Sequence, residues 1–347
     1  MVEVPGAVGQ NPDRFRPISI SEPNHRQASV VCMIHEPIFI IGAPRSGTSI
    51  LFRALSMHPD LWHLPRESHA VFEGPFHPDR GFESNRITEA DVTAENLKQI
   101  HDGFAQRVLN LGVLDVDQKK WLTDRSLTER IRNRAMMKIL TQRSRKQLPS
   151  SFRLLEKTPK NSLRVSALAA MFPDARFIYL RREAASNIDS LLAGWRAFDK
   201  FGPIKRHRFC SAGYEIANQL QLTDYDGDRW KFALVPDWQR LRGQSCANVA
   251  AAQYFQCNSI AREDLNRIAP NNVFAVSFDG FVEDPVNAVR EILEWADLSL
   301  DTKAMDFAAN LPRVNDATPH LKRQANELRY PAEVEAAMAE WPDRVAA

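Results

Sequence analysis

Short runs rich in apolar residues recur along the chain, and they predict the strands of a buried sheet. None of these runs alternates apolar and polar positions with a period of two, which is the pattern of a strand with one face in water. Segments with helical spacing separate them. The predicted strands are 38–41, 61–64, 152–157, 176–180 and 273–277, and the predicted helices are 50–56, 164–170, 184–195, 248–268 and 285–297. Strands that alternate with helices are typical of an α/β fold, in which helices cover both faces of a parallel sheet.

Residues 1–36 differ from the rest of the chain in composition. They are rich in Pro, Gly, Asn and Ser and show no clear periodicity, so we expect an arm on the surface of the domain. Residues 37–347 are expected to form one domain with two inserted segments. The charged segment at about 85–147 predicts a helical insertion, and the irregular segment at about 196–245 predicts a substrate-side region.

The most informative local pattern is a glycine turn that follows the first predicted strand. Gly42 and Gly47 bound this turn, and Thr48 and Ser49 open the helix after it. The free backbone N–H groups at a helix start and the positive end of the helix dipole attract anions. The pattern therefore predicts an anion-binding loop; the simpler alternative is an ordinary strand-to-helix turn with incidental glycines.

This loop departs from the Walker A pattern, G-x-x-x-x-G-K-[ST], at one position. Gly42, Gly47 and Ser49 match the pattern, but Thr48 stands where a lysine normally reaches the β- and γ-phosphates. The long cation is instead Arg45, inside the turn. We therefore expect the loop to hold one phosphate-like group rather than a triphosphate with magnesium.

Composition limits the classes of protein that fit the chain. Its 347 residues, 44% hydrophobic and 25% charged, are enough for one large α/β domain or two small ones, and a net charge of +2 gives no argument for nucleic-acid or membrane binding. The 4 cysteines show no C-x-x-C spacing, which disfavours a zinc site or a disulfide scaffold. We see neither a signal-peptide pattern nor an apolar run of about 20 residues, so a cytoplasmic location is expected.

Three separated motifs make the chain resemble the sulfotransferases that use 3′-phosphoadenosine 5′-phosphosulfate (PAPS). Residues 44–49, Pro-Arg-Ser-Gly-Thr-Ser, resemble the family's 5′-phosphosulfate loop. Arg182, at the end of a predicted strand, and Ser190, on the next helix, resemble its 3′-phosphate site. Residues 276–285, Val-Ser-Phe-Asp-Gly-Phe-Val-Glu-Asp-Pro, resemble its x-Y-E-D-L-x-x-D-P segment.

The resemblance spans about residues 37–300 and is closest to the group that includes tyrosylprotein and bacterial carbohydrate sulfotransferases. Ala184 replaces a usual proline, Asp279 a usual glutamate and Phe281 a usual leucine, and these departures concern packing more than chemistry. The resemblance implies a P-loop-like three-layer sandwich with a central, mostly parallel sheet and helical insertions.

PAPS carries two separated anionic groups, so its binding requires two anion sites at one edge of the sheet. The first would consist of loop residues, namely Arg45, Ser46, Gly47, Thr48 and Ser49. Arg182 and Ser190 would form the second, through a charge-assisted contact and a hydroxyl donor. The resemblance also implies that Tyr254 stacks on the adenine and that Lys322 and Arg323 close over the 3′-phosphate. The alternatives are a core aromatic and a solvated pair.

Sulfuryl transfer is an in-line displacement that needs positioning, neutralisation of the leaving phosphate and a base for the acceptor. Glu67 is the predicted base, because the resemblance implies a glutamate close to this position. His69 and Glu73 are the alternatives, and an imidazole has the better-matched intrinsic pKa. The resemblance places Lys157 near the bridging oxygen of the leaving group, a task that Arg45 would share.

Two other classes of function stay open. A P-loop kinase of small molecules is disfavoured by Thr48, and a catalytically silent nucleotide-binding protein would keep the sheet and the loop. Lys160 is expected to be solvated, and no metal is expected because no Walker B aspartate follows a strand. The acceptor would be a hydroxyl or amine on a glycan, lipid, peptide or small molecule, and a homodimer is left open.

Overall fold

The computed structural model describes the chain from residue 33 onward with several gaps. The described residues are 33–77, 81–110, 142, 146–196, 214, 216–227, 229–311 and 327–341. The predicted arm therefore lies almost wholly outside them, as do Lys322, Arg323 and much of both predicted insertions. The division of the chain into an arm and one domain stays a prediction.

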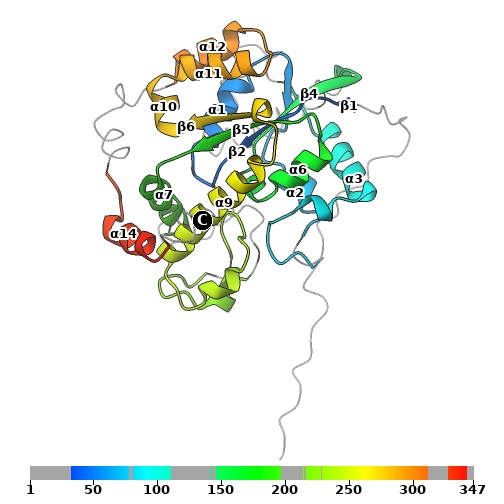
Figure 1. The fold of residues 1–347 in the computed structure, drawn as a ribbon. Coiled ribbons are helices and arrows are strands. Elements are labelled where there is room, and N and C mark those ends of the chain that lie inside the picture. The colour runs from blue at the N-terminus through cyan, green and yellow to red at the C-terminus, as the bar shows by residue number, and fades with distance from the viewer. Residues whose placement is uncertain are drawn as a thin grey trace, which may run out of the picture. The chain divides into compact units, whose positions relative to one another are not determined.

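The described strands form one parallel sheet (Figure 1). Along the main path the order is β1-β4-β2-β5-β6, and β3 also pairs with β4. The strands are β1 (Met33–Ile34), β2 (Ile38–Ile41), β3 (Leu61–His63), β4 (Ser151–Glu156), β5 (Arg176–Arg181) and β6 (Val273–Ser277). The predicted strands are all present, and every strand pairing is parallel.

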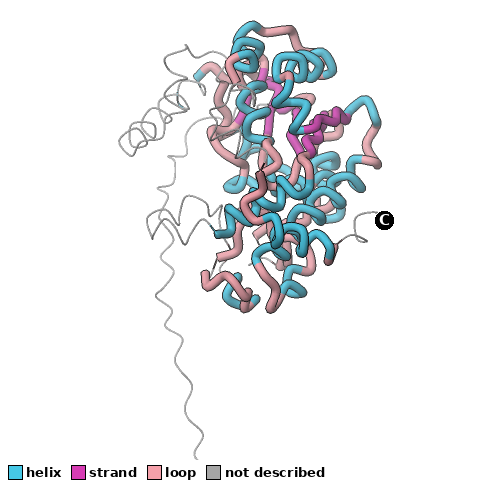
Figure 2. Tube along the Cα trace, turned by 90° about the vertical axis from the view of Figure 1, so that its left-hand side faces the viewer, coloured by secondary structure: helices cyan, strands magenta, loops and turns pink. Residues whose placement is uncertain are grey.

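Helices cover both faces of the sheet, which confirms the predicted α/β class (Figures 1 and 2). One face carries α1 (Thr48–Leu55), α10 (Phe278–Glu283), α11 (Pro285–Trp295) and α12 (Thr302–Ala309). The other face carries α2 (His69–Phe72), α3 (Ala94–Ala105) and α6 (Val165–Met171). The short helix α10 lies within the third sequence motif and was not predicted.

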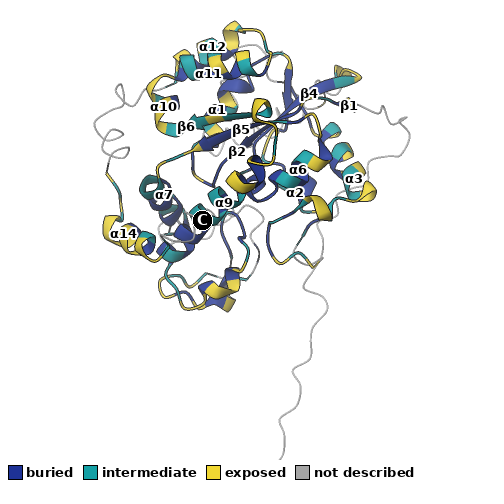
Figure 3. Cartoon of the chain, in the orientation of Figure 1, coloured by how far each residue is buried: buried dark blue, intermediate teal, exposed yellow. Residues whose placement is uncertain are grey.

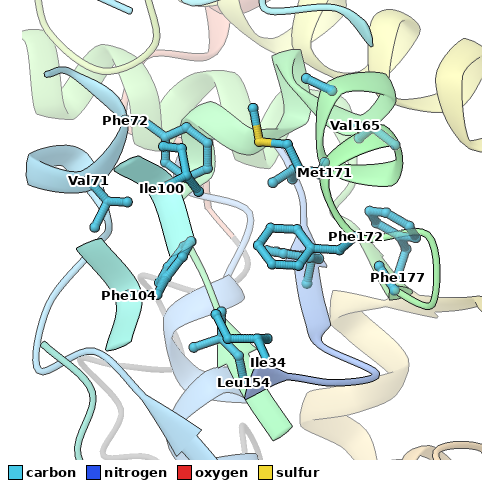
Figure 4. Packing of buried hydrophobic residues seen from close by; sticks show 14 of the residues in the cluster. Ile34, Val71, Phe72, Ile100, Phe104, Leu154, Val165, Met171, Phe172 and Phe177 are labelled. Carbon is cyan, nitrogen blue, oxygen red and sulfur yellow. The ribbon is translucent and has the colours of Figure 1, made fainter. Parts of the chain in front are cut away.

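The central strands are buried on both sides, and this explains why they show no period-two pattern. In β2, Phe39 and Ile41 belong to one apolar cluster, whereas Ile38 and Ile40 belong to the cluster on the opposite face. All four side chains are at most 1% exposed. Figure 3 shows β2 and β5 largely in the dark blue of buried residues, whereas β6 at the edge of the sheet is intermediate or exposed, and Figure 4 shows the cluster that includes Phe72, Phe104 and Phe172. Water contacts neither face, so no polar residue is selected at alternate positions.

A third apolar cluster forms away from the sheet, between α7 (Ala184–Arg196), α9 (Cys246–Leu265) and α14 (Pro331–Ala339). Trp195 of α7 lies in this cluster, and the described part of the irregular segment adds Trp230 and Trp238; all three are buried. Their edge-to-face contacts, 5.4 and 6.2 Å between ring centroids, are those of a core. Among the described helices, none combines the length and the apolar character needed to cross a lipid bilayer.

Candidate active site

The parallel sheet gathers the predicted site residues at one edge. The segments that follow β2, β4 and β5 start at the same end of three adjacent strands, because neighbouring parallel strands end together. The chain also continues from β2 to β3 on one side of the sheet and reaches β5 on the other, which makes the end of β2 a topological switch point. Ligands of open α/β sheets bind at such points.

The glycine loop at this switch point is held in a strained conformation. Arg45 and Gly47 both have positive φ, at 70° and 100°. Gly47 is the N-cap of α1 and makes no side-chain cap bond, so the first N–H groups of α1 are not capped by that residue. The hydroxyl of Ser46 is buried and has no hydrogen-bond partner among the described atoms. An anion in the loop would satisfy these donors.

Gly47 is also the position where the loop contacts the third motif. A Cβ atom at Gly47 would lie 2.2 Å from the ring of Phe278, the first residue of α10. That distance is far below van der Waals contact, so a side chain at this position would force the loop and α10 apart. The second glycine of the motif is therefore required both by its φ angle and by this contact.

We expect Gly47→Ala to destabilise the fold more than a substitution that changes φ alone. Gly243→Ala is the matched control, because Gly243 has φ +73° but nothing within 4 Å of its would-be Cβ. The control should cost about 1–2 kcal/mol for the left-handed conformation, and Gly47→Ala about 1–3 kcal/mol more for the collision. Urea denaturation of both variants measures the difference, and equal losses would contradict the steric account.

The loop is linked directly to the predicted second anion site. Arg45 Nε donates to Ser190 Oγ at 3.2 Å, and Arg182 Nη1 donates to the carbonyl oxygen of Arg45 at 3.2 Å. The hydroxyl of Tyr254 donates to the carbonyl oxygen of Arg182 at 3.0 Å. The fold thus brings together four predicted residues: Arg45 of the loop, Arg182 and Ser190 of the second motif, and Tyr254 on α9 (Cys246–Leu265). Thr48 is buried at the start of α1, and Ser49 beside it is exposed.

This cluster has an excess of positive charge. Burial lowers the pKa of Arg45, and the charges of Arg182 and Arg329 lower it further. Burial likewise lowers the pKa of Arg182; nearby carboxylates raise it and Arg329 lowers it. Guanidinium groups that disfavour each other's charge in this way are preorganised to receive an anion, whose binding removes the repulsion.

Arg329 lies near this cluster, where its charge acts on Arg45 and Arg182, and the sequence did not indicate it. It precedes α14, and its backbone N–H donates to Asp189 Oδ1 at 2.6 Å, as does the N–H of Tyr330 at 3.0 Å. Asp189 is buried on α7, next to Ser190. An acidic residue beside a predicted phosphate site was the available signal in the sequence. A carboxylate there would repel the phosphate, but it can accept hydrogen bonds from the backbone of another segment, as Asp189 does.

The second half of the site is an ion-pair network around Glu67. Lys157, which directly follows β4, places Nζ 2.5 Å from Glu67 Oε1, and His69 Nε2 lies 2.9 Å from Glu67 Oε2. The other predicted acid, Glu73, has its Oε1 2.5 Å from Lys160 Nζ and 3.6 Å from His69 Nδ1. All three candidate bases are therefore neighbours.

Hydrogen bonds between Ser68 and Thr158 join the two segments that carry Glu67 and Lys157. The N–H of Ser68 donates to Thr158 Oγ1 at 2.7 Å, and the two hydroxyl oxygens are 2.9 Å apart. Thr158 in turn donates to Glu156 Oε1 at 2.6 Å. Because Ser68 follows Glu67 and Thr158 follows Lys157, these hydrogen bonds keep the ion pair of Glu67 and Lys157 in place.

In this network burial and pairing act in opposite directions on the pKa of Glu67, and likewise on that of Lys160. Burial raises the pKa of Glu67, but the hydrogen bond from His69 and the charge of Lys157 outweigh it and lower the pKa to about 2. Burial lowers the pKa of Lys160 to about 8, against the opposing effect of Glu73. The expectation that Lys160 is solvated is wrong, since its side chain is 2% exposed and also donates to the Tyr214 hydroxyl at 3.2 Å.

Comparison with known proteins identifies the family that uses such a site. The family model described as "Sulfotransferase family" matches residues 37–217, which is more than half of the chain. A search of the curated proteins finds no match.

Solved sulfotransferase structures are similar to the chain over most of its length, at low identity. The sulfotransferase domain from the curacin biosynthetic pathway is 16% identical, with a TM-score of 0.44, over 89% of this chain and 98% of that one. Sulfotransferase STF9 from Mycobacterium avium is 16% identical, with a TM-score of 0.44, over 90% and 76%. Mouse sulfotransferase SULT7A1, solved in complex with adenosine 3′,5′-bisphosphate (PAP), is 12% identical, with a TM-score of 0.34, over 89% and 74%.

Proposed function

This chain belongs to the sulfotransferase family, and we propose that it moves the sulfuryl group of PAPS to a hydroxyl group of an acceptor and releases PAP. The observation that carries the proposal is the chain of contacts from Ser190 through Arg45 to Arg182. These contacts join a one-phosphate loop to a second cationic position at the same sheet edge. A donor with separated 5′ and 3′ anionic groups needs two such positions.

The donor half of the site fits PAPS on two grounds. The buried, unpartnered hydroxyl of Ser46 and the uncapped start of α1 suit an anion in the loop. Arg182 and Ser190 would hold the 3′-phosphate, with Arg329 adding positive charge. Tyr254, which is half-buried and fixed by its hydrogen bond to Arg182, is proposed to stack on the adenine.

The acceptor half supplies a base and a cation. In the proposed reaction the acceptor oxygen forms a bond to sulfur as the bond from sulfur to the phosphate oxygen breaks. The hydroxyl proton passes to Glu67, which is ionised at neutral pH. Lys157, next to Glu67, neutralises the charge that develops on the leaving oxygen together with Arg45. The family match supports the transfer of a sulfuryl group, and we propose a hydroxyl as the acceptor because a base at the site would take up its proton.

Ligand-dependent thermal stability followed by a transfer assay tests this function. We expect PAP to raise the melting temperature, since it binds only the folded state. Radiolabelled PAPS should then label a hydroxyl-bearing acceptor in a panel of glycans, lipids, peptides and phenols. Stabilisation by ATP with magnesium but not by PAP would favour a kinase. Stabilisation by PAP without transfer to any acceptor would favour the catalytically silent reading.

A further inference from the structure

We propose that His69 is a positioning residue for the base: it holds one oxygen of Glu67 by an N–H donor and so reserves the other oxygen for the acceptor proton. The inference rests on the proposed function and extends it to a residue that would not itself touch the acceptor. On its opposite side the ring of His69 faces Glu73, which Lys160 holds by an ion pair.

The two oxygens of the Glu67 carboxylate have different partners. Oε1 lies 2.5 Å from Lys157 Nζ, and Oε2 lies 2.9 Å from His69 Nε2. An ionised carboxylate can only accept hydrogen bonds, so Nε2 of His69 must carry the proton in this contact. His69 is therefore the donor, and its imidazole is not available at Nε2 as a base.

The other nitrogen of the His69 ring faces a second carboxylate. Nδ1 is 3.6 Å from Glu73 Oε1, too long for a hydrogen bond, and it has no hydrogen-bond partner among the described atoms. His69 and Glu73 are four residues apart around α2, which places both side chains on one face. The imidazole is thus held between Glu67 and Glu73.

Buried hydrogen bonds hold Glu73, the carboxylate that faces Nδ1 of His69. Glu73 Oε1 accepts from Lys160 Nζ at 2.5 Å and from the Tyr214 hydroxyl at 3.4 Å. Asn85 Nδ2 donates to the same hydroxyl at 2.7 Å. Lys160 and Asn85 are at most 2% exposed, so these hydrogen bonds belong to the rigid interior. The chain of contacts runs from this interior to Glu67, whose side chain is 33% exposed.

This asymmetry matters during the proposed transfer. When Lys157 turns to the leaving oxygen, Glu67 Oε1 loses its partner while His69 still holds Oε2. The acceptor hydroxyl can then donate its proton to Oε1, and no proton moves to His69. A carboxylate held at one oxygen cannot rotate to exchange its two oxygens, so the base stays aligned with the acceptor.

Two substitutions of His69 distinguish its role as a hydrogen-bond donor from a role as the base. His69→Ala should lower kcat by about 10–100-fold, as expected when a catalytic group loses its alignment, with little change in the acceptor KM. His69→Gln retains an N–H donor of similar reach but cannot take up a proton at neutral pH, and it should recover most of kcat. The control is His101→Gln on α3. The half-buried ring of His101 stacks on the ring of Phe172, with 4.6 Å between the ring centroids.

A carboxylate titration provides a readout that needs no turnover. With ¹³C-labelled glutamate and the Glu67 signal assigned by its loss in Glu67→Gln, NMR should show a higher pKa for Glu67 in His69→Ala and a low one in His69→Gln. The inference is overturned if His69→Gln is as slow as His69→Ala, if His69→Ala is as fast as wild type, or if Glu67 titrates alike in both variants. If wild type transferred nothing, the proposed function would fail while the titration still decided this inference.

Discussion

Glu67→Gln is expected to reduce kcat for sulfuryl transfer by about 10²–10⁴-fold, the range of a general base. Glutamine keeps the shape of the side chain, and its one carbonyl oxygen can still accept a hydrogen bond from Lys157 or from His69, but it cannot take up the acceptor's proton. Binding of PAP should not change, because among the described residues Glu67 pairs with His69 and Lys157 and not with the loop or Arg182. Steady-state transfer rates and calorimetric PAP titration measure the two quantities.

Glu95→Gln is the matched control for this substitution. Glu95 lies in the first turn of α3 and is exposed, and its side chain accepts a hydrogen bond from Gln99 at 3.2 Å, so its loss should leave kcat unchanged. If Glu67→Gln retained wild-type kcat, the base would have to be another group in the network. The natural next variant would then be Glu73→Gln.

The pH dependence of Lys157→Ala follows from the low pKa of Glu67. Lys157 is one of the groups that lower this pKa to about 2, so its removal should raise the pKa toward the ordinary value of about 4.3. A carboxylate acts as a base only above its pKa, and the acid limb of the kcat/KM profile should therefore move to higher pH in this variant. The pH–rate profile of the residual activity checks the direction, and an unmoved acid limb would argue against the ion pair.

The same pKa shift predicts how stability depends on pH. A carboxyl whose folded pKa lies below its unfolded value stabilises the fold above the unfolded pKa and loses this contribution as pH falls. For Glu67 the loss extends from about pH 4.3 in the unfolded chain down to about 2 in the folded one. The melting temperatures of wild type and Glu67→Gln should therefore converge between these two pH values.

Local patterns indicated the contacts of the glycine loop with Arg182 and Ser190 better than those of the network around Glu67. A strand, a glycine turn and a helix start are contiguous, so Gly42 to Ser49 could be read directly. Arg182 and Ser190 are also close in sequence. Parallel strands end at one edge, and this rule alone places Arg182 beside the loop, where its contact with Arg45 is found.

The acceptor half depends on contacts between distant segments, which no local pattern encodes. Lys160 follows a strand with turn residues around it and was expected in solvent, but Glu73 and Tyr214 pair with it in the interior. Tyr214 comes from the segment that showed no periodicity. The contribution of Arg329 similarly requires that Asp189 anchor the chain before α14. Such long-range pairings follow from the tertiary fold alone.

Arg182→Ala is expected to weaken PAP binding by about 10–100-fold, the loss of one charge-assisted contact of about 1.5–3 kcal/mol. Arg181→Ala is its matched control. Arg181 is the adjacent residue and is exposed, and its guanidinium lies over the ring of Tyr179 at 5.9 Å. Because the guanidinium of Arg181 lies over Tyr179 and not at the carbonyl oxygen of Arg45, its loss should change the Kd less than twofold, within the range of a surface substitution of about 0.5 kcal/mol.

A second nucleotide decides whether Arg182 acts on the 3′-phosphate or through the loop. Arg182 also donates to the carbonyl oxygen of Arg45, so its removal could disturb the 5′ side of the site. Adenosine 5′-monophosphate lacks the 3′-phosphate but retains the 5′ group and the adenine. If Arg182 binds the 3′-phosphate, Arg182→Ala weakens the binding of PAP and leaves the binding of the monophosphate almost unchanged. The effects of the substitution and of the missing phosphate on the binding free energy are then non-additive. Equal weakening of both nucleotides would make Arg182 a support of the loop, and the second anion site would then fall to Ser190 and Arg329.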